Sequence, residues 1–99
     1  MANMATYILL SNFTDQGIRS VKETTKRAEA FRETARKLGA SVKEIYWTLG
    51  KYDVIAILEA PDVAAVTAVG LSLGAAGNVR TQTLAAFSAN EMSQIIGKI

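Results

Sequence analysis

Neither cysteine nor histidine occurs among the 99 residues of the chain. Without cysteine the chain forms no disulfide and offers no thiolate to a metal or a substrate, which suits a reducing compartment, so we expect a cytoplasmic protein. Without histidine it lacks the usual general base near neutral pH and the commonest transition-metal ligand. These two absences exclude serine–histidine triads, zinc sites and haem ligation. We therefore expect no bound metal and no cofactor.

Proline, charge and long hydrophobic runs are also scarce. One proline, 20% charged residues and 49% hydrophobic residues are typical of a globular chain. A net charge of +2 is too small to indicate a nucleic-acid partner. The apolar stretch over residues 63–77 is too short to span a bilayer, and residues 1–13 lack the pattern of a signal peptide. We expect a single domain over residues 1–99 that binds neither nucleic acid nor a membrane.

The hydrophobic pattern predicts strands alternating with helices. β-branched and aromatic residues predict strands over residues 6–13, 41–49, 53–59 and 78–87. Helical spacing predicts helices over residues 15–38, from Pro61 to about residue 74, and after a cap at Asn90. A loop of three residues between the two middle strands requires an antiparallel hairpin. The order is that of a ferredoxin-like split βαβ protein, an α+β fold with a four-stranded antiparallel sheet.

The helices carry further expectations. The first should pack its apolar stripe of Ile18, Val21, Phe31 and Leu38 on the sheet. Its basic residues should be solvated and paired with acids four positions earlier, Glu23 with Arg27 and Glu33 with Lys37. The second helix is apolar almost all round, so we expect it either beneath the terminal helix or in a subunit contact.

Two strands are apolar on both sides. The first carries Ile8 and Leu10 on one side and Tyr7 and Leu9 on the other, and the third strand repeats this pattern. Two helices cover only one face of such a sheet. The second apolar face therefore predicts a covering partner, most economically a second copy of the chain. We expect a homo-oligomer, with a dimer as its smallest unit, stacked as a dimeric α/β barrel.

One stretch links the chain to a known family. In "EIYWTLGKYDVIAILEAPD", residues 44–62, the hairpin holds Gly50, Tyr52 and Asp53. This segment, together with "YILLSNFTDQGIR", "KRAEAFRETARKLG" and "GNVRTQTLAAFS", resembles the GYD-domain family over nearly the whole chain. The resemblance implies a ferredoxin-like or dimeric α/β-barrel fold. It implies no established reaction, so it points to no catalytic residue.

Aromatic and polar residues at the hairpin are candidate ligand contacts, namely Tyr46, Trp47, Tyr52 and Asp53. A structural role is favoured for the turn itself, because glycine accepts positive φ and aspartate bonds backbone N–H groups. The alternative is that these side chains form the wall of a small pocket.

The run Arg80 to Thr83 is unusually polar for a central strand. Arg80 and Gln82 share one face, where they could present donors to an anionic ligand between stacked sheets. The alternative is a partly exposed strand.

These observations favour a non-enzymatic, homo-oligomeric module that binds a small molecule or has a regulatory role. The alternative is a cofactor-free enzyme of the oxygenase or isomerase type. In that case Tyr52 or Asp53 would transfer the proton and Arg80 would stabilise the oxyanion.

Overall fold

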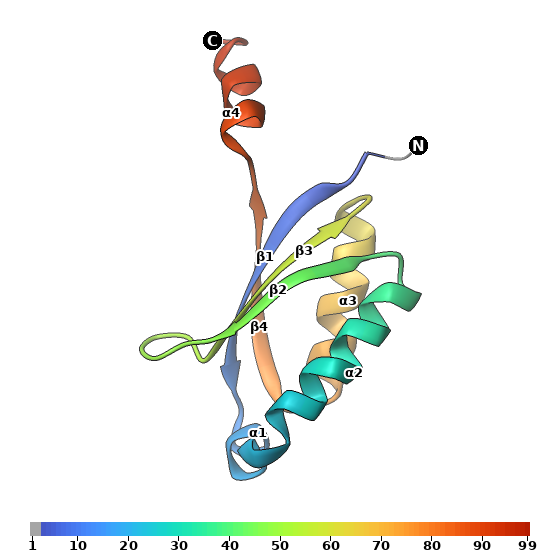
Figure 1. Ribbon diagram of the computed structural model, residues 1–99, viewed down its shortest axis with the longest axis vertical. Coiled ribbons are helices and arrows are strands. Elements are labelled where there is room, and N and C mark those ends of the chain that lie inside the picture. The colour runs from blue at the N-terminus through green and yellow to red at the C-terminus, as the bar shows by residue number, and fades with distance from the viewer. Residues whose placement is uncertain (1–2) are drawn as a thin grey trace.

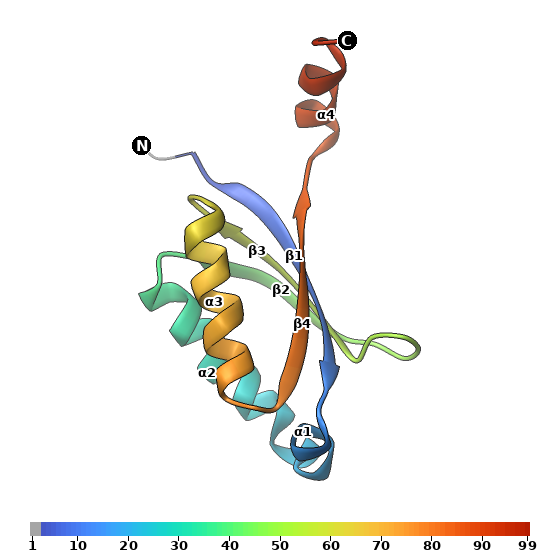
Figure 2. The same cartoon turned by 180° about the vertical axis from the view of Figure 1, so that it is seen from behind.

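The computed structural model describes residues 3–99 and contains one sheet with a layer of helices on one face (Figure 1). The elements follow in the order β1 (Ala5–Phe13), α1 (Asp15–Arg19), the 3-10 turn η1 (Val21–Glu23), α2 (Thr24–Lys37), β2 (Ser41–Trp47), β3 (Val54–Ala60), α3 (Val63–Ala75), β4 (Val79–Ala86) and α4 (Ala89–Ile96). Helices α2 and α3 cover the same face of the sheet, as the view from behind also shows (Figure 2). The predicted ferredoxin-like α+β fold is confirmed.

The four strands are all antiparallel and lie in the order β2-β3-β1-β4. The two strands that are apolar on both sides, β1 and β3, therefore form the centre of the sheet. Strand β4 lies at an edge, so the expectation that its polar run occupies a central strand was wrong. An edge strand has only one paired neighbour and tolerates polar side chains more readily.

The core lies between the sheet and the helix layer. Leu9 of β1, Leu58 of β3 and Val69 of α3 are fully buried in it, and α2 contributes Phe31 and Ala35. Each fully buried side chain of this size stabilises the fold by about 1.5–3 kcal/mol relative to an exposed one.

The long first helix was predicted as one piece, and this was wrong. The helix is interrupted at Ser20, where ψ is 32°, between α1 and η1. Phe31 is buried as expected, but Ile18 is 52% exposed. Val21 and Leu38 are also exposed, because the interruption turns the start of the helix away and Leu38 lies beyond its end.

Close packing explains where α1 sits. A Cβ on Gly17 would lie 1.9 Å from the carbonyl oxygen of Asn78, so only glycine permits this approach. Thr14 fixes the same junction, since its N–H donates to Asn78 O at 3.1 Å and its hydroxyl to Gly77 O at 2.6 Å. Helix α1 is thus attached to the start of β4.

Two helix starts differ from the prediction. Helix α3 begins at Val63 with Asp62 as its cap, whose carboxylate accepts the Ala65 N–H at 2.8 Å, so Pro61 precedes the helix instead of opening it. Helix α4 is capped by Ser88, which forms a capping box with Glu91. The predicted cap at Asn90 was therefore wrong, because a hydroxyl two positions earlier takes that role.

The ion pairs at the start of α2 and along it join residues three positions apart in the sequence, whereas a separation of four was expected. Glu23 pairs with Lys26 at 3.5 Å, and Glu33 pairs with Arg36. The hydrogen bond from Arg36 lowers the pKa of the exposed Glu33 carboxyl and raises the pKa of the Arg36 guanidinium. Arg27, the expected partner of Glu23, is engaged elsewhere.

Helix α4 does not cover α3, contrary to one of the two expected arrangements. It projects away from the sheet and the helix layer, and none of its residues is buried (Figures 1 and 2). Within residues 3–99, no helix is both long and apolar enough to cross a membrane.

Replacing Leu58 with alanine should lower the free energy of unfolding by about 2–5 kcal/mol, because the change leaves a cavity in the core. Leu49→Ala is the matched control. That leucine is fully exposed in the hairpin, so its loss should change stability by less than about 0.5 kcal/mol. Urea denaturation followed by circular dichroism at one protein concentration measures both. Equal losses in the two variants would contradict the position of Leu58 in the core.

Candidate functional site

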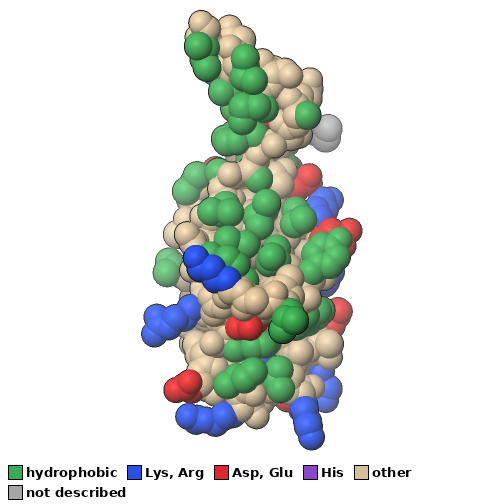
Figure 3. All heavy atoms as spheres, turned by 90° about the vertical axis from the view of Figure 1, so that its left-hand side faces the viewer, with side chains coloured by type: hydrophobic (Ala, Val, Ile, Leu, Met, Phe, Trp, Pro, Cys, Tyr) green, Lys and Arg blue, Asp and Glu red, His purple; other side chains and the backbone are tan. Residues whose placement is uncertain are grey.

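The face of the sheet opposite the helices is uncovered, and we call it the open face. Strand register places its side chains in two rows across the sheet. One row is Glu44, Ile57, Ile8 and Leu84, and the next is Tyr46, Ile55, Leu10 and Gln82. The hydrophobic side chains gather in the centre of this face, as Figure 3 shows.

The open face has the anatomy of a protein interface. Its centre is formed by four aliphatic side chains of β1 and β3, and Tyr46, 53% exposed, and Leu84 extend it on either side. The rim is polar and carries both signs of charge, with an ion pair of 3.5 Å between Lys43 and Glu59 on one side and Arg80 on the other. An apolar centre with a polar rim is typical of surfaces that associate.

The hairpin between β2 and β3 is held by its own backbone. Gly50 has a φ of 121°, a conformation that residues with side chains rarely adopt, so the expected role of this glycine is confirmed. The N–H of Thr48 donates to Asp53 O at 2.8 Å, and its hydroxyl donates to Tyr52 O at 2.6 Å. The loop tip is attached to β1 through Asn12, whose side-chain amide donates to Lys51 O at 2.6 Å.

Asp53 connects the hairpin to the end of β1. Its carboxylate oxygen Oδ2 accepts the N–H of Phe13 at 2.9 Å, and its own N–H donates to Ser11 O at 2.9 Å. The partner is a neighbouring strand and not the turn itself, which the sequence did not indicate. These bonds support the structural interpretation of the glycine–tyrosine–aspartate motif.

The other candidate residues separate into two groups. Tyr52 donates its hydroxyl hydrogen to Gln82 Oε1 at 3.2 Å, and Tyr46, Gln82 and Arg80 all belong to the open face. Trp47 lies on the opposite face, where its Nε1 donates to Thr24 Oγ1 of α2 at 3.0 Å. The structure therefore brings Tyr52 and Gln82 together and separates Trp47 from them. That these side chains contact a ligand remains a prediction.

A second exposed apolar surface was not singled out from the sequence. Residues 87–99, which we call the C-terminal arm, contain Met92, Ile95, Ile96 and Ile99 at the spacing of one helix face. Most of these side chains are exposed, and none is buried. The spacing of these residues could be read from the sequence. The sequence does not show whether the helix packs on the rest of the chain, and the structure shows that it does not.

Charged side chains do not gather into a metal-binding group on the described surface. Among residues 3–99, no three histidine, cysteine, aspartate or glutamate residues lie close enough to hold a metal ion.

The fold and the uncovered sheet define a small ferredoxin-like α+β protein with an apolar face available for association. The family model for the GYD domain matches residues 7–96, so the chain belongs to the GYD-domain family. It is 39% identical over 84 residues to the glutamine synthetase and cystathionine beta-lyase binding protein of Thermus thermophilus. The match covers 84% of this chain and 88% of that relative. No solved structure gives a significant match.

Replacement of Asp53 with alanine should lower the free energy of unfolding by about 1–3 kcal/mol, because the Phe13 N–H loses its acceptor. Asp53→Asn should cost roughly half as much, since an amide oxygen still accepts the bond without its charge. Lys51→Ala, at the exposed tip, is the control and should stay within about 0.5 kcal/mol of the parent. Chemical denaturation measures all three. If Asp53→Ala is as stable as the parent, Asp53 does not hold the hairpin to β1.

Proposed function

We propose that this protein is a non-enzymatic regulatory module, a homodimer in its smallest form, that binds a metabolic enzyme. The observation that carries the proposal is the open face. The four aliphatic residues at the centre of this face are half-buried, and covering their remaining apolar surface recovers about 25 cal/mol for each Å² removed from water.

A second copy of the chain is the simplest cover for the open face. A two-fold interface uses the same surface on both subunits, so the surface must be complementary to itself. The open face can meet this requirement, because its centre is apolar and its rim holds Glu44, beside the Lys43–Glu59 ion pair, toward one edge and Arg80 toward the other. Acidic and basic rim residues can then face each other across the stacked sheets.

The comparison with the Thermus thermophilus protein supports a protein partner in addition. That relative is named as a binding protein for glutamine synthetase and cystathionine beta-lyase. Glutamine synthetase is therefore the first enzyme to test with this chain. The C-terminal arm projects beyond the sheet and presents an apolar helix face, which suits docking into a groove of an enzyme.

The remaining expectations fit within this proposal. Tyr46, Tyr52, Arg80 and Gln82 would lie at the margin of the stacked sheets, where they could contact a small ligand. The enzyme alternative would use Tyr52 or Asp53 for proton transfer. The Tyr52 hydroxyl already donates to Gln82 and the Asp53 carboxylate already accepts the Phe13 N–H, which supports the binding role. We also propose that residues 1–99 act as one domain in the cytoplasm.

Ile57→Lys should weaken self-association by about 30-fold or more, because it places an unpaired charge at the centre of the covered face. Leu71→Lys is the matched control. That leucine is exposed on α3, away from the open face, so the variant should associate like the parent. Light scattering at micromolar concentration should give the parent at least twice the 10.6 kDa of one chain. A parent of 10.6 kDa would reject the dimer.

Ile96→Lys should weaken binding to purified glutamine synthetase by about tenfold or more, because it puts a charge on the apolar face of the C-terminal arm. Gln94→Lys adds the same charge to the polar face and should bind like the parent. Biolayer interferometry with the enzyme of the same organism measures the affinities. Equal binding by the two variants would exclude the arm as the contact. Loss of the dimer in Ile96→Lys would instead place the arm between the two copies.

A further inference from the structure

A cavity of about 330 Å³ lies between the sheet and the helix layer, on the side away from the open face. Its walls come from the two helices of the layer and from all four strands, among them Phe31 on α2, Leu73 on α3, Trp47 on β2 and Val54 on β3. This volume is at the lower end of the range of small-molecule sites in proteins. The cavity is partly open to solvent and its lining is mostly apolar, so it suits a small ligand with an apolar body.

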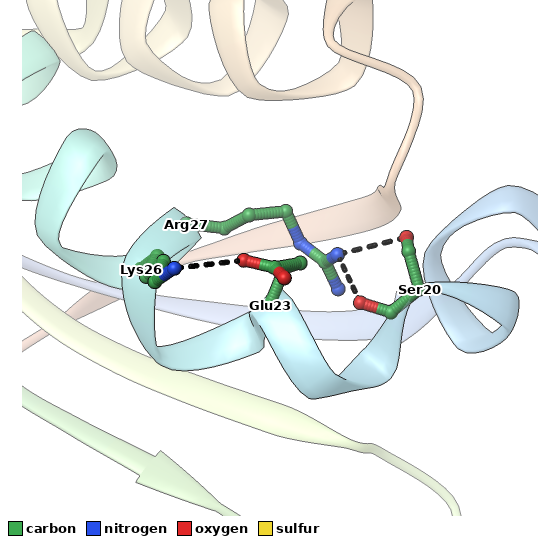
Figure 4. A network of polar contacts seen from close by, with 4 residues as sticks. All are labelled: Ser20, Glu23, Lys26 and Arg27. Atoms are coloured by element: carbon green, nitrogen blue, oxygen red, sulfur yellow. Dashed lines mark hydrogen bonds and ion pairs between the residues drawn. The ribbon is translucent and has the colours of Figure 1, made fainter.

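Arg27 is the one charged residue among the described residues that line this cavity. Its guanidinium is held in place by the interrupted start of the helix, as Figure 4 shows (Figure 4). Nη1 donates to the carbonyl oxygen of Ser20 at 2.8 Å and to its hydroxyl oxygen at 3.0 Å, and Nη2 donates to Gly17 O at 3.1 Å. A guanidinium has five N–H donors, so two remain for a further acceptor.

No carboxylate within residues 3–99 forms an ion pair with Arg27. Glu23, four residues before Arg27 at the end of η1, pairs with Lys26 instead at 3.5 Å. The acceptors around Arg27 are neutral oxygens, which leave its positive charge uncompensated in a half-buried position. Such a guanidinium favours an anion, and its planar donors match a carboxylate.

We propose that the cavity binds a small amphipathic carboxylate, with its apolar body against Trp47, Val54 and Leu73 and its carboxylate on Arg27. All groups that form this site belong to one chain. The proposal therefore goes beyond the role of the open face, and it does not depend on the dimer.

Octanoate is a suitable probe, with 1-octanol as the uncharged molecule of the same chain length. Isothermal titration calorimetry of the parent should show octanoate binding at least about tenfold more tightly than octanol, the size expected for one charge-assisted hydrogen bond. Arg27→Gln should abolish this preference and leave octanol binding unchanged. Lys26→Gln is the matched control, since it removes an exposed charge one residue earlier and should keep the preference.

Two further variants distinguish binding in the cavity from binding on the open face. Ala28→Leu fills the cavity and should weaken both probes, which keeps the proposal testable if Arg27→Gln fails to fold. Ile57→Lys should bind octanoate like the parent, because the cavity does not use the open face. Binding lost in Ile57→Lys but kept in Ala28→Leu would assign octanoate to the open face and overturn the proposal. The proposal would also be overturned if octanoate does not bind the parent protein, or if octanoate and octanol bind it with equal affinity.

Discussion

The central pair of strands, β1 and β3, imposes the constraint on which the rest of the structure depends. Both strands are apolar on both sides. The helices α2 and α3 cover only one face of the sheet, so one apolar side of each strand lies without a helix over it. Leu9 and Leu58 are buried beneath α2 and α3, while Ile8 and Ile57 lie in the same strands on the uncovered side. Burial of the first set stabilises the monomer fold. The second set is only half-buried in the single chain, and this is why we propose a covering partner.

At the C-terminal end of β1, hydrogen bonds join the strand to the β2–β3 hairpin and join the start of α1 to the residues before β4. Asp53 brings the hairpin to Phe13, and Thr14 brings the start of α1 to Gly77 and Asn78. The interruption of the helix that follows exposes the backbone oxygens to which Arg27 donates. The hairpin that carries the glycine–tyrosine–aspartate motif and the start of α1 are thus both bonded to neighbouring segments at this end of the sheet.

The open face and the cavity share their strands. Along β1 and β3, alternate side chains point to opposite sides, so Leu9 and Ala56 line the cavity while Leu10 and Ile55 lie on the open face. An occupant of the cavity and a copy on the open face would therefore act on the same two strands.

Much of this architecture follows from local sequence patterns, because the period of side-chain alternation reports which residues share a face. The element order, the hairpin, the two apolar sides of β1 and β3 and the common face of Arg80 and Gln82 could all be predicted in this way. The periodicity of apolar residues does not show which other part of the chain packs against a given face of a helix or strand. The interruption at Ser20, the free position of α4, the side on which Trp47 lies and the placement of Arg27 at a cavity depend on contacts between residues far apart in the chain. Only the tertiary structure decided them.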